Sequence, residues 1–141
     1  MKIGVFSDVH GNLEALNACL ARYKKEGVQR FIYCGDMIGY GPDPEKCVRK
    51  IADLNLIACV LGNHDAVFAH PELEVFFNYD AKTALEENKK RLSEKSIRYL
   101  SALPSVEHGT DFTVVHGTPA DPIKENLSSC YQFRTNYPRG R

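Results

Sequence analysis

The sequence has no excess of charge of either sign, because 18 Lys and Arg residues balance 18 Asp and Glu residues among 141. Such a chain has no overall positive field that would draw it to nucleic acid or to anionic lipid. It also has no cluster of basic and aromatic residues, so we expect no nucleic-acid-binding patch. A polyanionic substrate would have to be held by a local site.

Long hydrophobic runs are also missing. The opening residues MKIGVFSDVHGN contain a short apolar run that soon meets Asp8 and His10. This run is too short and too quickly charged for a signal peptide or a membrane span. We therefore expect no membrane partner and a cytoplasmic location.

Two common motifs of redox chemistry are absent. The five cysteines, at positions 19, 34, 47, 59 and 130, show no CxxC spacing, and no GxGxxG stretch is present. These absences argue against a dithiol redox enzyme and against a dinucleotide-binding fold. We expect reduced, buried thiols in preference to a disulfide framework or a zinc site.

What is present is the composition of one globular domain, with 43% hydrophobic and 26% charged residues. Short apolar runs predict strands at 2–7, 30–34 and 56–61. Capping residues and helical spacing predict helices from Asn12 toward Gly27 and from Asp43 toward Asn55. This alternation predicts an α/β fold with a parallel sheet.

The second half of the chain predicts two more helices and a hairpin. Apolar residues recur at helical spacing beyond Asp80, and again from the capping residue Ser93 to Pro104. Strands at 106–108 and 112–115 flank a turn at 109–111. The last stretch, 125–141, has no clear period, and we expect a poorly ordered tail there.

Four polar clusters directly follow the predicted strands, and the carboxyl ends of parallel strands are where α/β proteins bind ligands. The clusters are Asp8 with His10, Gly35 with Asp36, Gly62 to Asp65, and His116 with Gly117. Carboxylates, an amide and imidazoles suit Mn²⁺, Fe or Zn²⁺, and no thiolate takes part. Each cluster alone is more often a cap or a turn, but four in order favour a metal site.

Four segments together resemble a known family: SDVHGN, GDMIGYGPDP, GNHD and VVHGTP. They are similar to the first four motifs of the calcineurin-like metallophosphoesterases, and the second resembles the small bacterial and archaeal branch of that superfamily. The similarity spans about residues 1 to 123. It implies a metallophosphoesterase-type αββα sandwich.

The resemblance also implies a set of ligands and a reaction. Asp8 and His10 would hold one divalent ion, Asp36 would bridge two, and Asn63 and His116 would hold the second. Mn²⁺ is the first expectation, with Fe, Zn²⁺, Ni²⁺ and Mg²⁺ as alternatives. A hydroxide activated by the two ions would hydrolyse a phosphomonoester or a phosphodiester, carried by a phosphorylated small molecule or a diester substrate.

Catalytic roles are implied for His64 and Asp65. His64 matches the family histidine that contacts the phosphate and assists the leaving oxygen, while Asp65 would orient that imidazole or brace the loop. The alternative is a loop imidazole satisfied by Asp65 alone. Tyr40 could line the substrate pocket, and His70 and His108 are expected to be solvated.

One family motif is absent, because the resemblance includes a GHTH motif near the C-terminus and this sequence has no histidine after His116. We therefore expect an incomplete domain at 1–124, with a sheet edge left open to form homo-oligomers. A premature stop, a frameshift or a fragment boundary would each explain this ending. The alternative function is a catalytically silent relative that binds metal weakly or serves as an interaction module.

Overall fold

The structure is a computed structural model that describes residues 2–124. Its centre is a parallel sheet of three strands in the order β1-β2-β3, formed by β1 (Ile3–Phe6), β2 (Arg30–Tyr33) and β3 (Leu56–Cys59). Each strand pairs in parallel with its neighbour in the chain. The predicted α/β fold with a parallel sheet is therefore confirmed, although all three strands end earlier than expected.

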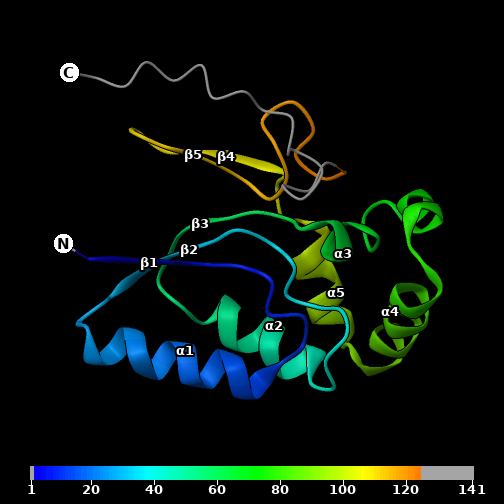
Figure 1. Cartoon of the computed structure of the whole chain (residues 1–141), viewed down its shortest axis with the longest axis horizontal. Helices are drawn as coiled ribbons and strands as arrows, with labels where there is room; N and C mark the ends of the chain where they lie inside the picture. Colours follow the sequence, from blue (N-terminus) through cyan, green and yellow to red (C-terminus); the bar gives the residue numbers. More distant parts are fainter. Residues whose placement is uncertain (1, 125–141) are drawn as a thin grey trace.

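Alternating side chains give this sheet two apolar faces. Tyr33 and Cys59 face a core that they share with Leu16 of α1 (Leu13–Lys25) and Val48 of α2 (Pro44–Ala52). The residues one position earlier, Ile32 and Ala58, pack on the opposite side. Figure 1 shows α1 and α2 covering one side of the sheet and the β4–β5 hairpin lying on the other.

Helix caps explain where most of the helices begin. The Asn12 side chain accepts a hydrogen bond from the peptide nitrogen of Ala15 at 2.9 Å, as an N-cap does. Asp43 occupies the N-cap position of α2 but makes no side-chain cap bond; it pairs with Lys46 at 2.6 Å. Here the fixed φ of Pro44 at the first helical position favours the helix start.

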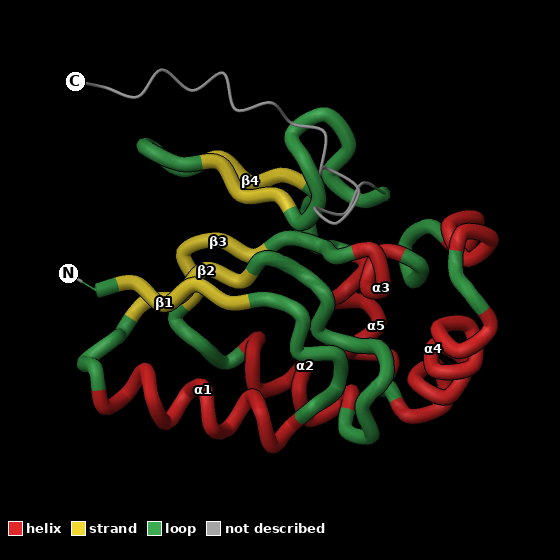
Figure 2. The backbone as a smooth tube through the Cα atoms, viewed as in Figure 1, coloured by secondary structure: helices red, strands yellow, loops and turns green. Residues whose placement is uncertain are grey.

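The segment after β3 contains two short elements that the sequence did not predict, α3 (Asn63–Ala66) and the 3₁₀ turn η1 (Pro71–Phe76). They lead into α4 (Tyr79–Arg91) and α5 (Glu94–Ser101), the two predicted helices. α4 begins earlier than expected because Asn78 caps it, accepting from the peptide nitrogen of Ala81 at 2.9 Å. Figure 2 shows α3, α4 and α5 gathered at one end of the sheet.

The hairpin is antiparallel, as predicted, and pairs β4 (Val106–His108) with β5 (Thr113–Val115). Val114 is buried against Ile32 and Ala58. The β1 end of the same sheet face is open, because Ile3 is 39% exposed and Val5 is 55% exposed. The homo-oligomer expected from an open edge stays a prediction, and the predicted tail at 125–141 lies outside the described residues.

Two further expectations concern the cysteines and membranes. The four cysteines at positions up to 124 are all free thiols, and Cys47 and Cys59 are buried. The predicted burial therefore holds for these two, whereas Cys19 and Cys34 are only half-buried. The reduced state of the thiols stays a prediction. Within residues 2–124, no helix combines the length and the apolar character needed to cross a membrane.

Candidate metal centre

The loops after β1 and β2 carry three residues other than glycine that have positive φ, and all three belong to the predicted site. Asp8 has φ 55°, His10 has φ 47° and Asp36 has φ 64°. Residues other than glycine rarely adopt positive φ, so the surrounding structure must hold these three in that conformation. The two loops are joined by backbone hydrogen bonds from Asp8 to Gly35 at 2.9 Å and from His10 to Asp36 at 3.0 Å.

Two histidines are fixed by hydrogen bonds to backbone carbonyls. His10 Nδ1 lies 3.0 Å from the carbonyl oxygen of Ile38, and His116 Nδ1 lies 2.8 Å from that of Cys34. A carbonyl oxygen can only accept, so in each neutral ring Nδ1 carries the proton. Nε2 of each ring is then a bare lone pair, the form of imidazole that binds metals.

Both lone pairs face the same buried carboxylate. Asp36, which is 2% exposed, has its Oδ2 3.6 Å from His10 Nε2 and 3.5 Å from His116 Nε2. Asp8 Oδ1 lies 3.7 Å from His10 Nε2, and Asn63 Oδ1 lies 3.1 Å from His116 Nε2. The structure thus brings the five residues expected as ligands to one place, with Asp36 between two pairs of donors.

These donors need a positive charge among them. Burial, and then the neighbouring carboxylate of Asp65, raises the pKa of Asp36 well above its usual range. When both rings are neutral, the imidazole Nε2 atoms and the side-chain oxygens facing them are all acceptors, and a cation between them would satisfy them together. Ligand atoms of Asp8, Asp36 and His116 all lie within 4.8 Å of one another, and so do those of His10, Asp36 and His64. The oxygen and nitrogen donor set fits Mn²⁺, Fe or Zn²⁺.

Asp65 stabilises the loop that carries Asp36 through hydrogen bonds to its backbone. It is fully buried, and its carboxylate accepts hydrogen bonds from the peptide nitrogens of Asp36 at 2.7 Å, Met37 at 2.9 Å and Ile38 at 3.2 Å. A fourth comes from Gly62 at 3.2 Å. Within the described residues no hydrogen bond joins Asp65 to the His64 ring, so of the two expected roles the contacts match the brace.

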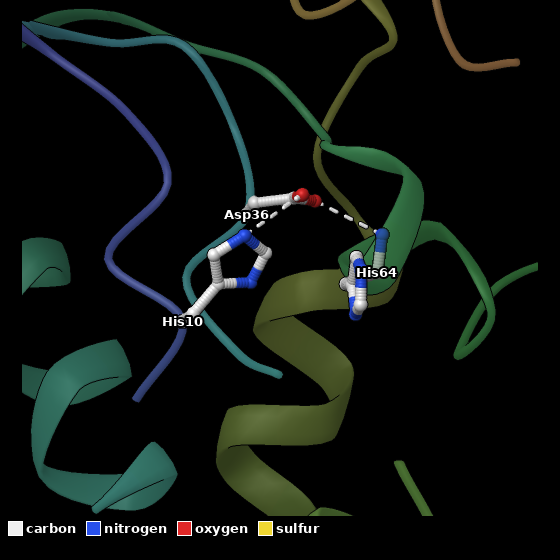
Figure 3. Close-up of side chains that lie close together, drawn as sticks. All are labelled: His10, Asp36 and His64. Atoms are coloured by element: carbon white, nitrogen blue, oxygen red, sulfur yellow. Dashed lines mark hydrogen bonds and ion pairs between the residues drawn. The ribbon is translucent and has the colours of Figure 1, made fainter. Parts of the chain in front are cut away.

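His64 lies beside the carboxylate and is buried among aromatic rings. Its peptide nitrogen donates to Asp36 Oδ1 at 2.9 Å, and Figure 3 shows this bond on the side of the carboxylate away from His10. Burial, followed by the charges of His10 and His116, lowers the pKa of His64 to about 4. Its Nδ1 is buried and has no hydrogen-bond partner among the described residues. This ring is therefore free to meet a ligand, which a loop histidine satisfied by Asp65 would not be.

Two glycines near the centre lie so close to candidate ligands that a side chain at either position would not fit. A Cβ on Gly62 would collide with the Asp36 carboxylate and its peptide nitrogen. Gly39 has φ +148°, and a Cβ there would strike the His10 ring. A larger side chain at either position would displace a candidate ligand.

Asn88 on α4 is a buried residue at this site that the sequence did not reveal. It is 3% exposed, and its amide nitrogen donates to the carbonyl oxygens of Gly39 and Ala84, each at 2.6 Å. Its amide oxygen lies 3.3 Å from the Gly39 peptide nitrogen that donates to it. The only signal in the sequence is a polar residue on the apolar side of a helix, which is weak on its own.

Of the remaining candidates, Tyr40 lies beside the centre and His70 and His108 lie away from it, as expected. Tyr40 lines a pocket next to His64, and its ring centroid lies 5.1 Å from that of His64. His70 and His108 lie away from the centre: the first pairs with Glu72 at 3.4 Å, and the second contacts Thr113 Oγ1 at 3.0 Å. Both histidines are at the surface, as predicted.

A parallel α/β sheet with carboxylates and imidazoles gathered at its carboxyl end is an arrangement suited to binding metal ions. The family model of the calcineurin-like phosphoesterases matches residues 1–139, and the chain belongs to this family. The resemblance drawn from the four motifs is therefore confirmed.

Two similar proteins and one further structure with the same fold can be compared with the chain. The chain is 38% identical over 125 residues to an uncharacterized protein of Methanocaldococcus jannaschii, a match that covers 85% of this chain and 51% of that protein. It is 37% identical to a metallophosphoesterase from Sphaerobacter thermophilus, with a TM-score of 0.76 over 89% of this chain and 51% of the other. A hypothetical protein from Pyrococcus horikoshii shares the fold, with a TM-score of 0.72 at 21% identity over 87% of this chain and 57% of that one. The chain spans about half the length of the first two of these relatives.

Proposed function

We propose that this protein is a metal-dependent phosphoesterase that hydrolyses a phosphomonoester or a phosphodiester. The observation that carries the proposal is the buried Asp36 carboxylate, which faces the bare Nε2 atoms of His10 and His116 at 3.6 and 3.5 Å. Membership of the calcineurin-like phosphoesterases supports the same class of reaction.

The five donors divide naturally into two sets that share Asp36. Asp8 Oδ1 lies 3.7 Å from His10 Nε2 in one set, and Asn63 Oδ1 lies 3.1 Å from His116 Nε2 in the other. We assign one divalent ion to each set, with Mn²⁺ as the first expectation and Fe, Zn²⁺, Ni²⁺ and Mg²⁺ as alternatives. When bound, such ions supply an activated water nucleophile and neutralise the oxygens of the phosphoryl group.

Other residues of the chain hold the candidate ligands in position. The carbonyls of Ile38 and Cys34 orient the two imidazoles, and Asp65 holds the backbone that carries Asp36. We assign to His64 the contact with a phosphoryl or leaving-group oxygen, because its ring adjoins His10 at a centroid distance of 4.8 Å and has an unpaired nitrogen. Asp65 then acts through the Asp36 loop and need not touch the substrate.

The test is hydrolysis of p-nitrophenyl phosphate and bis(p-nitrophenyl) phosphate by the 141-residue chain with added Mn²⁺. Asp36→Asn keeps the shape of the side chain and removes the shared charge, so we expect turnover to fall at least about a hundredfold. Asp111→Asn is the matched control, since Asp111 is exposed in the hairpin turn. It should retain the wild-type rate.

Two results would contradict the proposal. One is equal turnover by the wild type and Asp36→Asn; the other is no turnover of either ester with any of the five metals. A calorimetric Mn²⁺ titration distinguishes the silent alternative. One weak site without turnover would support a metal-binding relative, whereas two tight sites with turnover would support the enzyme.

A further inference from the structure

A small pocket opens beside the metal centre and shares two residues with it. Asn63 and His64 belong to its lining, and the rest comes from the loop at Tyr40, from η1, from the start of α4 and from Ile123 and Lys124. The pocket measures about 330 Å³, which is near the lower end of the range for small-molecule sites, roughly 300–1,000 Å³. A group held here would adjoin whatever the metal centre binds.

The walls of this pocket are mainly aromatic and aliphatic. The Phe77 ring lies edge-on to the His64 ring at a centroid distance of 4.8 Å, and Tyr40 lies edge-on at 5.1 Å. Leu73 and Ala81 contribute aliphatic surface. Phe76 lines the rim and is 69% exposed, although large apolar side chains are usually buried. Rings arranged in this way suit a planar aromatic group.

The charges around the pocket suit an anion as well. None of the described residues that line it is Asp or Glu, and Lys124 stands at its rim with its Nζ 5.1 Å from the centre of the Phe76 ring. A second pocket that also touches Tyr40 is lined by two carboxylates, Asp80 and Glu87, against one cation, Arg91. The pocket at His64, which has a cation and no carboxylate in its described lining, is therefore the better suited to a negatively charged ester.

We propose that this pocket binds an aromatic arm of the phosphoester, so that the preferred substrates are aryl or heteroaryl esters. The phosphoryl group would lie at the centre around Asp36, and the ring would lie against Phe76, Phe77 and Tyr40. This inference rests on the proposed function, because the metal centre must first hold the phosphoryl group.

The test uses two phosphonates that cannot be hydrolysed, so that binding is measured without turnover. Methylphosphonate and phenylphosphonate are titrated calorimetrically into the Mn²⁺-loaded protein. We expect phenylphosphonate to bind about three- to tenfold more tightly, the usual gain from aromatic contacts of this kind. Phe76→Ala should bring the two dissociation constants close together and leave that of methylphosphonate unchanged.

Val75→Ala is the matched control. Val75 lies next to Phe76 in η1, is 70% exposed and is not part of the pocket lining. It should keep the wild-type preference for the phenyl compound. Equal binding of both phosphonates by the wild type, or an unchanged preference in Phe76→Ala, would overturn this inference alone. Failure of both phosphonates to bind would overturn the proposed function as well.

Discussion

Two backbone carbonyls decide the chemistry of the histidines in this protein. The oxygens of Ile38 and Cys34 each accept a hydrogen bond from an imidazole Nδ1, so in the neutral rings of His10 and His116 it is Nε2 that carries the lone pair. An imidazole held in this way loses little freedom when it binds a metal. The same ring in solution would divide between two tautomers.

Removing one of these imidazoles should weaken metal binding. We expect His116→Ala to raise the dissociation constant for Mn²⁺ at least about tenfold, because one ligand and its fixed geometry are lost. His108→Ala serves as the control, since His108 lies on the same hairpin but is exposed. Calorimetric titration measures both, and identical affinities in the two variants would show that His116 is not a ligand.

Replacing Asp65 should lower the free energy of unfolding. Its carboxylate accepts from four peptide nitrogens, and an amide in Asp65→Asn would present an N–H₂ group to some of these donors. We expect a loss of about 2–4 kcal/mol in the free energy of unfolding, since buried donors without partners are costly. Urea denaturation measures the loss. Asp53→Asn, at an exposed helix end, is the control and should stay within about 0.5 kcal/mol of the wild type. If both substitutions had the same effect, Asp65 would not be stabilising the Asp36 loop.

At the scale of secondary-structure elements, the centre is built from loops that three parallel strands deliver to one edge. β1, β2 and β3 end at Phe6, Tyr33 and Cys59, and the candidate ligands Asp8, Asp36 and Asn63 follow within a few residues. His116 arrives from the hairpin on the other side of the sheet. Because four separate elements contribute, the geometry depends on how the loops are held together.

Helix α4 holds one of these loops through Asn88. Replacing Asn88 by Ala would leave the Gly39 backbone without its side-chain partners, and we expect a loss of about 1–3 kcal/mol in the free energy of unfolding. Since Gly39 contacts the His10 ring, Mn²⁺ affinity should also fall, by about 10- to 100-fold. Glu86→Ala, exposed on the same helix, should change neither quantity. Unchanged metal affinity in Asn88→Ala would show that α4 plays no part in positioning the centre.

The strands and the main helices could be predicted because their signals are local. Apolar runs marked β1, β2 and β3, and Asn12 and Ser93 marked helix starts that the structure bears out. The helix α3 was missed because its four residues, Asn63–Ala66, coincide with a motif whose polar residues suggest a loop. Asn88 was missed because its partner, Gly39, lies 49 positions earlier, and no local pattern records that contact.

For the whole molecule, metal binding and folding should be linked. The donors come from loops as far apart as Asp8 and His116, so the unfolded chain cannot present them together. A ligand that binds only the folded state stabilises it by about 2.7 kcal/mol when its free concentration is about 100 times the dissociation constant. We therefore expect Mn²⁺ to raise the melting temperature by several degrees, and EDTA to reverse this change.

Asp36→Asn is the informative variant in that melting experiment. It should lose most of the Mn²⁺-dependent shift, because Asp36 is shared by both donor sets. Asp111→Asn should show the full shift. A shift of the same size in Asp36→Asn would mean that Mn²⁺ stabilises the protein from some other place.

The central claim is that Asp8, His10, Asp36, Asn63 and His116 surround a shared cation centre, and anomalous diffraction at the manganese edge tests it most directly. Crystals of the chain grown with Mn²⁺ should show anomalous density in contact with the Asp36 carboxylate and with Nε2 of both His10 and His116. Crystals that contain Mn²⁺ elsewhere, but show no anomalous density beside Asp36, would contradict the account.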